Sequence, residues 1–76
     1  QLLESQKYVC PVSGRVLTPQ NTVAEHRIPL RKNGKHELSN IILVDQDAAK
    51  LKRYMTDEEI VRLAADIINA LGKEYG

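Results

Sequence analysis

The chain has 76 residues, of which 42% are hydrophobic and 28% are charged, and its formal net charge is +1. This length allows one domain over residues 1–76 with a small core, and the composition suits a globular chain rather than a disordered one. The longest apolar runs, such as residues 41–44, fall far short of the roughly 20 residues that cross a bilayer, and no secretory signal opens the chain, so we expect no membrane partner and a cytoplasmic location.

The first part of the chain predicts a short helix, two turns and an extended strand. Residues 1–9 suit a short helix, and residues 10–14 suit a turn because Gly14 can adopt a positive φ. A short extended piece and a second turn lead to residues 22–30, which have the β-compatible composition of a strand. Pro29 closes this strand, because a proline cannot donate a hydrogen bond to a ladder.

The middle of the chain predicts a loop, a second strand and a helix. Residues 31–39 are polar and contain an Asn-Gly pair at 33–34, which favours a bend. The apolar run 41–44 is rich in β-branched residues and has the length of a strand. Asp45 is a suitable start for a helix over residues 45–54, because a carboxylate there accepts hydrogen bonds from unpaired N–H groups.

The last segment predicts a long amphipathic helix over residues 57–71. Thr56 and Glu59 have the spacing of a capping box, and Gly72 is expected to stop the helix. Because its apolar residues recur at helical spacing, we expect them to form one face that packs into the core. These residues are Ile60, Leu63, Ala64, Ile67, Ile68 and Leu71. The order of elements predicts an α+β fold.

Basic residues are concentrated in the middle of the chain. Residues 27–53 carry seven Lys and Arg against three acids, or +4, whereas residues 54–76 carry two against five, or −3. This asymmetry suits an anionic partner that docks on one face, although an ordinary solvated surface explains it equally well. The candidate contact residues are Arg27, Arg31, Lys32, Lys35, Lys50, Lys52 and Arg53.

Two short motifs carry the functional prediction. Residues 24–30 are Ala-Glu-His-Arg-Ile-Pro-Leu, and residues 37–44 are Glu-Leu-Ser-Asn-Ile-Ile-Leu-Val. Together they closely resemble the HNH (ββα-metal, or His-Me finger) endonuclease family, and are similar to the HNH domains of group II intron reverse transcriptases. The resemblance covers about residues 9–55. It implies a small ββα-metal core, to which this chain adds a short N-terminal helix and the C-terminal helix 57–71.

The resemblance also implies roles for individual residues. Members of the family cut a phosphodiester bond, usually in DNA, with one divalent metal. His26 would be the general base, a role that a neutral imidazole suits. Asn40 would fix that histidine and the loop through hydrogen bonds. Glu25 would be an oxygen ligand for Mg²⁺ or Mn²⁺.

The chain departs from the family on its central helix. The position of the third histidine is occupied by Ala49, and that of a further histidine one turn later by Arg53. Alanine has no donor atom, and the fixed charge of arginine would repel a metal. Three explanations are open: an engineered His→Ala change at position 49, a lineage that lost cleavage but kept its nucleic-acid surface, or a replacement ligand such as Asp45 or Asp47.

The chain departs again at the zinc knuckle that many relatives carry. The first cysteine pair is replaced by Cys10 and Ser13, and the second by Asp45 and Ala48. One thiolate cannot hold zinc or form an internal disulfide. We therefore expect no structural zinc, a reduced and partly buried Cys10, and a C-terminal helix that supplies the missing stability by packing.

Two hypotheses of function follow from these residues. The first is an HNH-type endonuclease domain, impaired as written, that docks on duplex DNA through helix 45–54 and loop 31–36. The second is a non-catalytic module that binds nucleic acid or another domain of a larger protein, and a purely structural module is a third reading. The chain has few aromatic residues for stacking single strands, and the choice between DNA and RNA stays open. Since the first residue is Gln1 rather than Met, we expect a piece of a longer protein.

Overall fold

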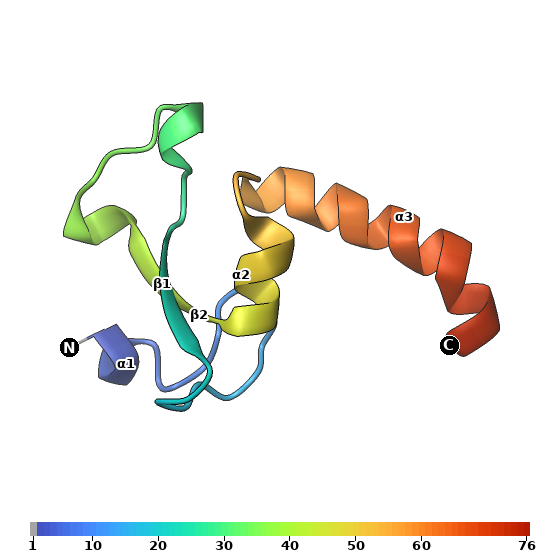
Figure 1. Ribbon diagram of the computed structural model, residues 1–76, viewed down its shortest axis with the longest axis horizontal. Helices are drawn as coiled ribbons and strands as arrows, with labels where there is room; N and C mark the ends of the chain where they lie inside the picture. The colour runs from blue at the N-terminus through green and yellow to red at the C-terminus, as the bar shows by residue number, and fades with distance from the viewer. Residues whose placement is uncertain (1) are drawn as a thin grey trace.

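The computed structural model describes residues 2–76 and consists of a two-stranded antiparallel sheet with helices around it (Figure 1). Two strands joined by a long loop are followed directly by a helix, and a short N-terminal helix and a long C-terminal helix flank this unit. The predicted α+β class is therefore confirmed. The elements are α1 (Leu2–Ser5), β1 (Thr22–His26), the 3₁₀ turns η1 (Leu30–Lys32) and η2 (Leu38–Asn40), β2 (Ile41–Asp45), α2 (Gln46–Lys52) and α3 (Asp57–Tyr75).

Two predicted boundaries in the first half of the chain are wrong. The helix expected over residues 1–9 is only α1, because the chain turns at Lys7 and Tyr8, both of which have a positive φ; Gln1 lies outside the described residues. The strand expected over 22–30 ends at His26, where the long loop begins. This loop contains two 3₁₀ turns and folds back at Gly34, where a Cβ would collide with the carbonyl oxygen of Ile28.

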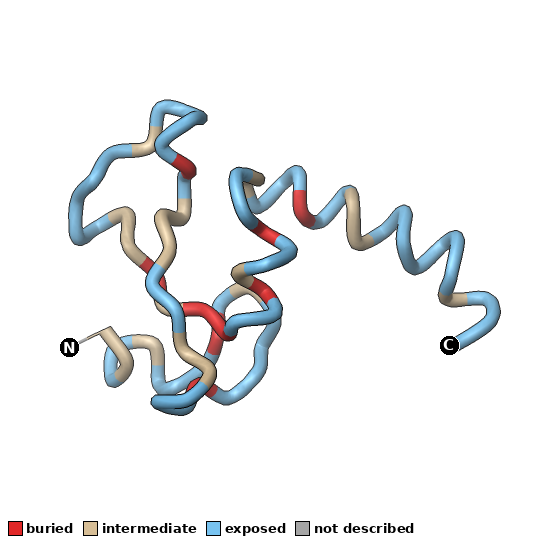
Figure 2. The backbone as a smooth tube through the Cα atoms, viewed as in Figure 1, coloured by how far each residue is buried: buried red, intermediate tan, exposed pale blue. Residues whose placement is uncertain are grey.

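The core lies between β2, the start of α2 and the N-terminal loop (Figure 2). Ile42 and Val44 point into it from β2, because alternate side chains of a strand face opposite sides. Cys10 and Leu17 reach it from the N-terminal loop. Cys10 is fully buried rather than partly buried as predicted, and its sulfur accepts from the backbone N–H groups of Ser13 and Asp45.

Asp45 joins the strand, the helix and the N-terminal loop. Its side chain is 2% exposed and accepts from the backbone N–H groups of Asp47 and Ala48, so that it is the N-cap of α2. Ser13 Oγ donates to its other oxygen at 2.5 Å, and Arg15 lies 3.4 Å away. Burial alone would raise the pKa of Asp45, but the hydrogen bonds from Ser13 and the helix N–H groups outweigh it and lower the pKa.

Helix α3 begins as predicted but neither ends nor packs as predicted. The capping box of Thr56 and Glu59 is present, whereas Gly72 does not stop the helix, which continues to Tyr75. Only Ile60 of the apolar face is buried, while Ile68 and Leu71 are 68% and 54% exposed. The helix projects away from the sheet (Figure 1), so the prediction that this face packs into the core is wrong. Within residues 2–76, no helix has both the length and the apolar character needed to cross a membrane.

Candidate functional site

Residues that are far apart in the sequence meet in one pocket between β1 and α2. The pocket has a volume of about 460 Å³ and is lined by Glu25 from β1 and by Ala49, Lys50 and Arg53 from α2 and its end. Pairing of β1 with β2 places Glu25 opposite Ile42, and α2 follows β2 without a loop. The strand residue predicted to hold a metal thus faces the two helix positions where the sequence departs from the family motif.

A second pocket of about 340 Å³ adjoins the first and shares Glu25, Arg53 and Tyr54 with it. His26 and Arg31 line this second pocket. The predicted base therefore lies on the same stretch of surface as Glu25. Both residues are partly buried, at the end of the strand where the long loop begins.

Asn40 fastens the two sides of the long loop. Its Oδ1 accepts from the Ile28 N–H at 2.9 Å, and its Nδ2 donates to the carbonyl oxygens of Ile28 and Lys35 at 2.9 and 2.8 Å. Its backbone carbonyl accepts from the N–H of Arg27 at 2.8 Å, which extends the ladder beyond His26. All donors and acceptors of the side-chain amide face the loop. Asn40 therefore fixes the backbone on which the histidine sits, rather than the imidazole itself.

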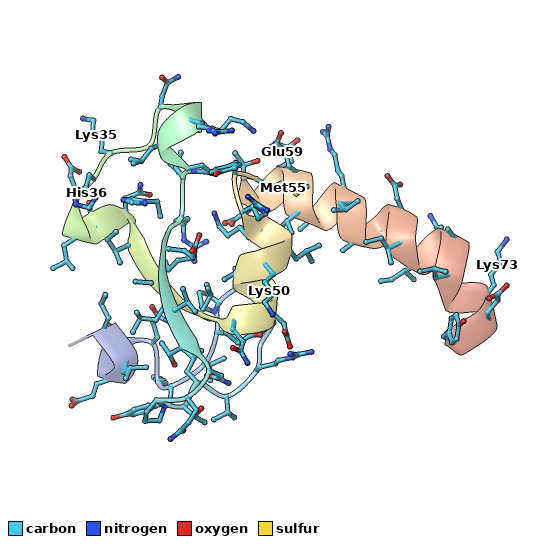
Figure 3. The ribbon with its side chains drawn as sticks, viewed as in Figure 1. Lys35, His36, Lys50, Met55, Glu59 and Lys73 are labelled. Atoms are coloured by element: carbon cyan, nitrogen blue, oxygen red, sulfur yellow. The ribbon has the colours of Figure 1, made fainter. Side chains whose placement is uncertain are left out.

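The imidazole of His26 is held by His36, a residue not included in the predicted site. His26 Nε2 and His36 Nδ1 lie 2.8 Å apart, and the two ring centroids are 5.1 Å apart with a tilt of 51°. His36 lies on the loop between η1 and η2, beside Lys35 (Figure 3). The only sequence signal for this pair was the presence of a second histidine in the loop of the motif.

Arg31 and Arg53 both lie close to the ring of Tyr54. The Arg31 guanidinium carbon lies 3.9 Å from the ring centroid and that of Arg53 lies 5.5 Å from it, both within range of a cation–π interaction. Arg53 has a φ of 41°, a conformation that side-chain-bearing residues seldom adopt, and this backbone ends α2. Tyr54 was missed by the sequence analysis because an exposed tyrosine has no distinctive spacing.

Lys52 is not a surface residue, and its prediction as a phosphate contact is wrong. Its side chain is 0% exposed, and its Nζ donates to the carbonyl oxygens of His26 at 2.9 Å and Met55 at 3.1 Å. Burial lowers the pKa of Lys52, and the nearby carboxylates of Glu25 and Asp57 oppose this shift. Lys52 thus ties the end of β1 to the turn between α2 and α3.

The other predicted contact residues fall into two groups. Arg27 pairs with Asp57 at 2.6 Å and Lys32 pairs with Glu59 at 2.5 Å, so both residues tie the loop to the start of α3. The hydrogen bond from Lys32, with that from the Thr56 N–H, lowers the pKa of Glu59 to about 2. In the described part of the chain, four predicted contact residues have no ion-pair partner: Arg31, Lys35, Lys50 and Arg53.

The side chains around the first pocket do not fit a divalent metal. Glu25 is one carboxylate, Ala49 supplies no ligand atom, and Arg53 brings a positive charge. Asp45 cannot replace the missing ligands, because its carboxylate is buried and already accepts hydrogen bonds from Ser13 and from the backbone N–H groups at the start of α2. Across residues 2–76, no three or more His, Cys, Asp and Glu side chains are grouped as metal ligands.

Comparison with models of known protein families gives no match for this chain, and comparison with curated proteins gives none either. A function can therefore be inferred only from the residues and their geometry. Three features matter most: the pocket that joins Glu25 to α2, the hydrogen bonds by which Asn40 clamps the loop, and the paired histidines.

Replacing Lys52 with Met should lower the free energy of unfolding by about 1–3 kcal/mol, because two carbonyl oxygens lose a buried donor. Urea unfolding followed by circular dichroism measures this loss. Lys50→Met is the matched control, since Lys50 is exposed on the same helix, and it should change stability by less than about 0.5 kcal/mol. Equal stability of the two variants would show that the Lys52 hydrogen bonds do not hold β1 to the α2–α3 turn.

Proposed function

We propose that this chain is an HNH-type nucleic-acid-binding domain that docks on the backbone of duplex DNA and has little or no metal-dependent nuclease activity as written. The observation that carries the proposal is the convergence of Glu25, Ala49 and Arg53 on one pocket. This is where the family motif requires a metal to be held between the first strand and the helix. The residues that carry the sequence resemblance therefore lie on one surface, which has one carboxylate, no complete set of metal ligands and a fixed positive charge.

The charge of this surface supports binding to phosphate. Arg31 and Arg53 both lie within cation–π range of Tyr54 beside the two pockets, and neither guanidinium forms an ion pair within residues 2–76. Lys50 extends the patch along α2. Arginine presents several donors in a planar fork that matches phosphate oxygens. Arg53 thus places a fixed cation at a helix position where the active relatives have a metal ligand.

The surface suits duplex rather than single-stranded nucleic acid. Among the residues that line either pocket, Tyr54 is the one aromatic ring apart from His26, and two guanidiniums lie within 5.5 Å of its centroid. One tyrosine in contact with two guanidiniums does not form a platform on which successive bases could stack. Contacts to phosphate alone give affinity that depends on salt and little on sequence.

The second hypothesis is a non-catalytic module that binds nucleic acid or another domain of a larger protein, and its binding to another domain is kept as the alternative. The exposed apolar face of α3 favours it, since an apolar stripe of this length is a common protein-binding feature. It concerns a different surface from the two pockets. The two functions are therefore compatible, and a nucleic-acid binding experiment tests the first without involving the second.

Arg31→Gln and Arg53→Gln should each weaken binding to a short labelled DNA duplex and reduce the slope of log K against log salt by about 1, because each removes one phosphate contact. Fluorescence anisotropy in metal-free buffer at several salt concentrations measures both quantities. Arg62→Gln is the matched control, since Arg62 lies on α3 in a pair with Glu58. An equal loss in all three variants, or no salt-dependent binding by the unmodified chain, would contradict the proposal.

Ala49→His should create a helix ligand opposite Glu25 and give metal-dependent nicking of supercoiled plasmid. Bound metal stabilises the developing charge by several kcal/mol, so the rate should exceed that of the unmodified chain by at least about 100-fold. The assay uses Mg²⁺, Mn²⁺ or Ni²⁺, with and without a further Arg53→His change that removes the repelling charge.

Two controls make the nicking result specific. Ala65→His adds a histidine to an exposed position of α3 and should remain inactive, and Glu25→Gln added to Ala49→His should abolish the new activity. Inactivity of folded Ala49→His and of its Arg53→His double variant would count against the nuclease origin of the site. Equal nicking by the unmodified chain would contradict the claim that its metal site is incomplete.

A further inference from the structure

The hydrogen bond between His26 and His36 restricts which ring nitrogen of each histidine can carry a proton. Two neutral imidazoles 2.8 Å apart can share only one proton, because one nitrogen must donate and the other must accept. The proton therefore lies either on His26 Nε2 or on His36 Nδ1. The two arrangements differ at the other ring nitrogen of His26, Nδ1, which is unprotonated in the first case and protonated in the second.

In the first arrangement, His26 Nε2–H donates to His36 Nδ1, and both rings carry their proton on Nε2. In the second, His36 Nδ1–H donates to His26 Nε2, and both rings carry their proton on Nδ1. Free neutral imidazole side chains prefer the Nε2–H form, so the first arrangement satisfies the intrinsic preference of both rings and the second opposes it twice. The hydrogen bond is the same in both cases, and this preference decides between them.

We propose that His36 is a positioning residue that holds His26 in the Nε2–H tautomer and leaves His26 Nδ1 as the unprotonated, basic nitrogen. Among the hydrogen bonds of residues 2–76, none involves His26 Nδ1. The histidine lines the second pocket beside Glu25 and Arg31. A partner on the other ring nitrogen is the usual means by which a protein sets which nitrogen of a histidine can accept a proton or a ligand.

The backbone around His36 is built to keep this partner in place. Asn40 Nδ2 donates to the carbonyl oxygen of Lys35, the residue before His36, and the same amide group donates to and accepts from Ile28. Lys52 holds the carbonyl oxygen of His26 itself. The backbone of His26 is therefore held by Lys52 and the backbone next to His36 is held by Asn40, although the His36 side chain is exposed. The functional importance of this tautomer rests on the proposed role of His26 as a base. The tautomer itself can be measured even if the chain has no nuclease activity.

Long-range ¹H–¹⁵N NMR of the ¹⁵N-labelled chain, at a pH where both imidazoles are neutral, reports the tautomer directly. We expect the His26 signals to be those of a protonated Nε2 and an unprotonated Nδ1. His36→Ala should shift them to the values of a free imidazole, in which the Nε2–H form still predominates but the Nδ1–H form is also populated. His36→Asn should restore the original signals, because the asparagine Oδ1 can accept from Nε2–H where His36 Nδ1 did. Backbone amide spectra check that each variant is folded.

A protonated His26 Nδ1 in the unmodified chain, or unchanged His26 signals in folded His36→Ala, would overturn the inference. The nuclease proposal fails separately, through an inactive Ala49→His variant. If that variant does nick plasmid, adding His36→Ala should slow it about 10- to 100-fold, the usual effect of removing an outer-shell partner, and adding His36→Asn should preserve most of the rate. A rate that is unaffected by His36→Ala would also overturn the positioning role.

Discussion

The buried carboxylate of Asp45 links the N-terminal loop, β2 and α2 at one point. It caps α2, accepts from Ser13 in the N-terminal loop, and lies beside the Cys10 sulfur that accepts from its own N–H. The four positions that the resemblance equates with zinc ligands, Cys10, Ser13, Asp45 and Ala48, thus meet in space and are joined by direct hydrogen bonds. A carboxylate in such a site is stable only because every hydrogen bond is satisfied. The orientation of α2 follows from this junction.

The orientation of α2 in turn determines what the site contains. Because α2 starts at the end of β2 and crosses beside β1, Ala49 and Arg53 face Glu25. At the other end of α2, Lys52 donates to the carbonyl oxygens of His26 and Met55 and so fixes the end of β1. One buried anion and one buried cation, at opposite ends of a seven-residue helix, therefore hold the strand that carries Glu25 and His26.

Much of the fold could be predicted from local sequence. The turn residues, the strand at 41–44 and the capping box of Thr56 and Glu59 each depend on neighbours in the chain, and the structure contains them all. The end of β1 and the burial of Lys52 could not be predicted, because they depend on contacts with residues 12 or more positions away, such as those of Asn40 and Lys52. Periodicity showed that α3 has an apolar face, but not whether this short chain covers it.

The candidate site, like the fold, could be predicted from the sequence only in part. The motif brought Glu25, His26 and Asn40 into the prediction, and the structure gathers the first two around adjoining pockets while Asn40 clamps the loop behind them. His36 and Tyr54 were not part of the predicted site, because single histidine and tyrosine residues in polar segments have many ordinary explanations. Their contacts depend on how the long loop folds back against β1 and α2, because His36 then lies beside His26 and Arg31 lies against the ring of Tyr54.

The most direct test is to map where a DNA duplex binds, by NMR titration of the ¹⁵N-labelled chain in metal-free buffer. We expect the chemical-shift changes to concentrate on His26, Arg31, Lys50 and Arg53 and to weaken as salt is added, with no response from α3 beyond Arg62. Shifts confined to the apolar face of α3, or no shifts at low salt, would contradict the claim that the surface between β1, the long loop and α2 binds nucleic acid.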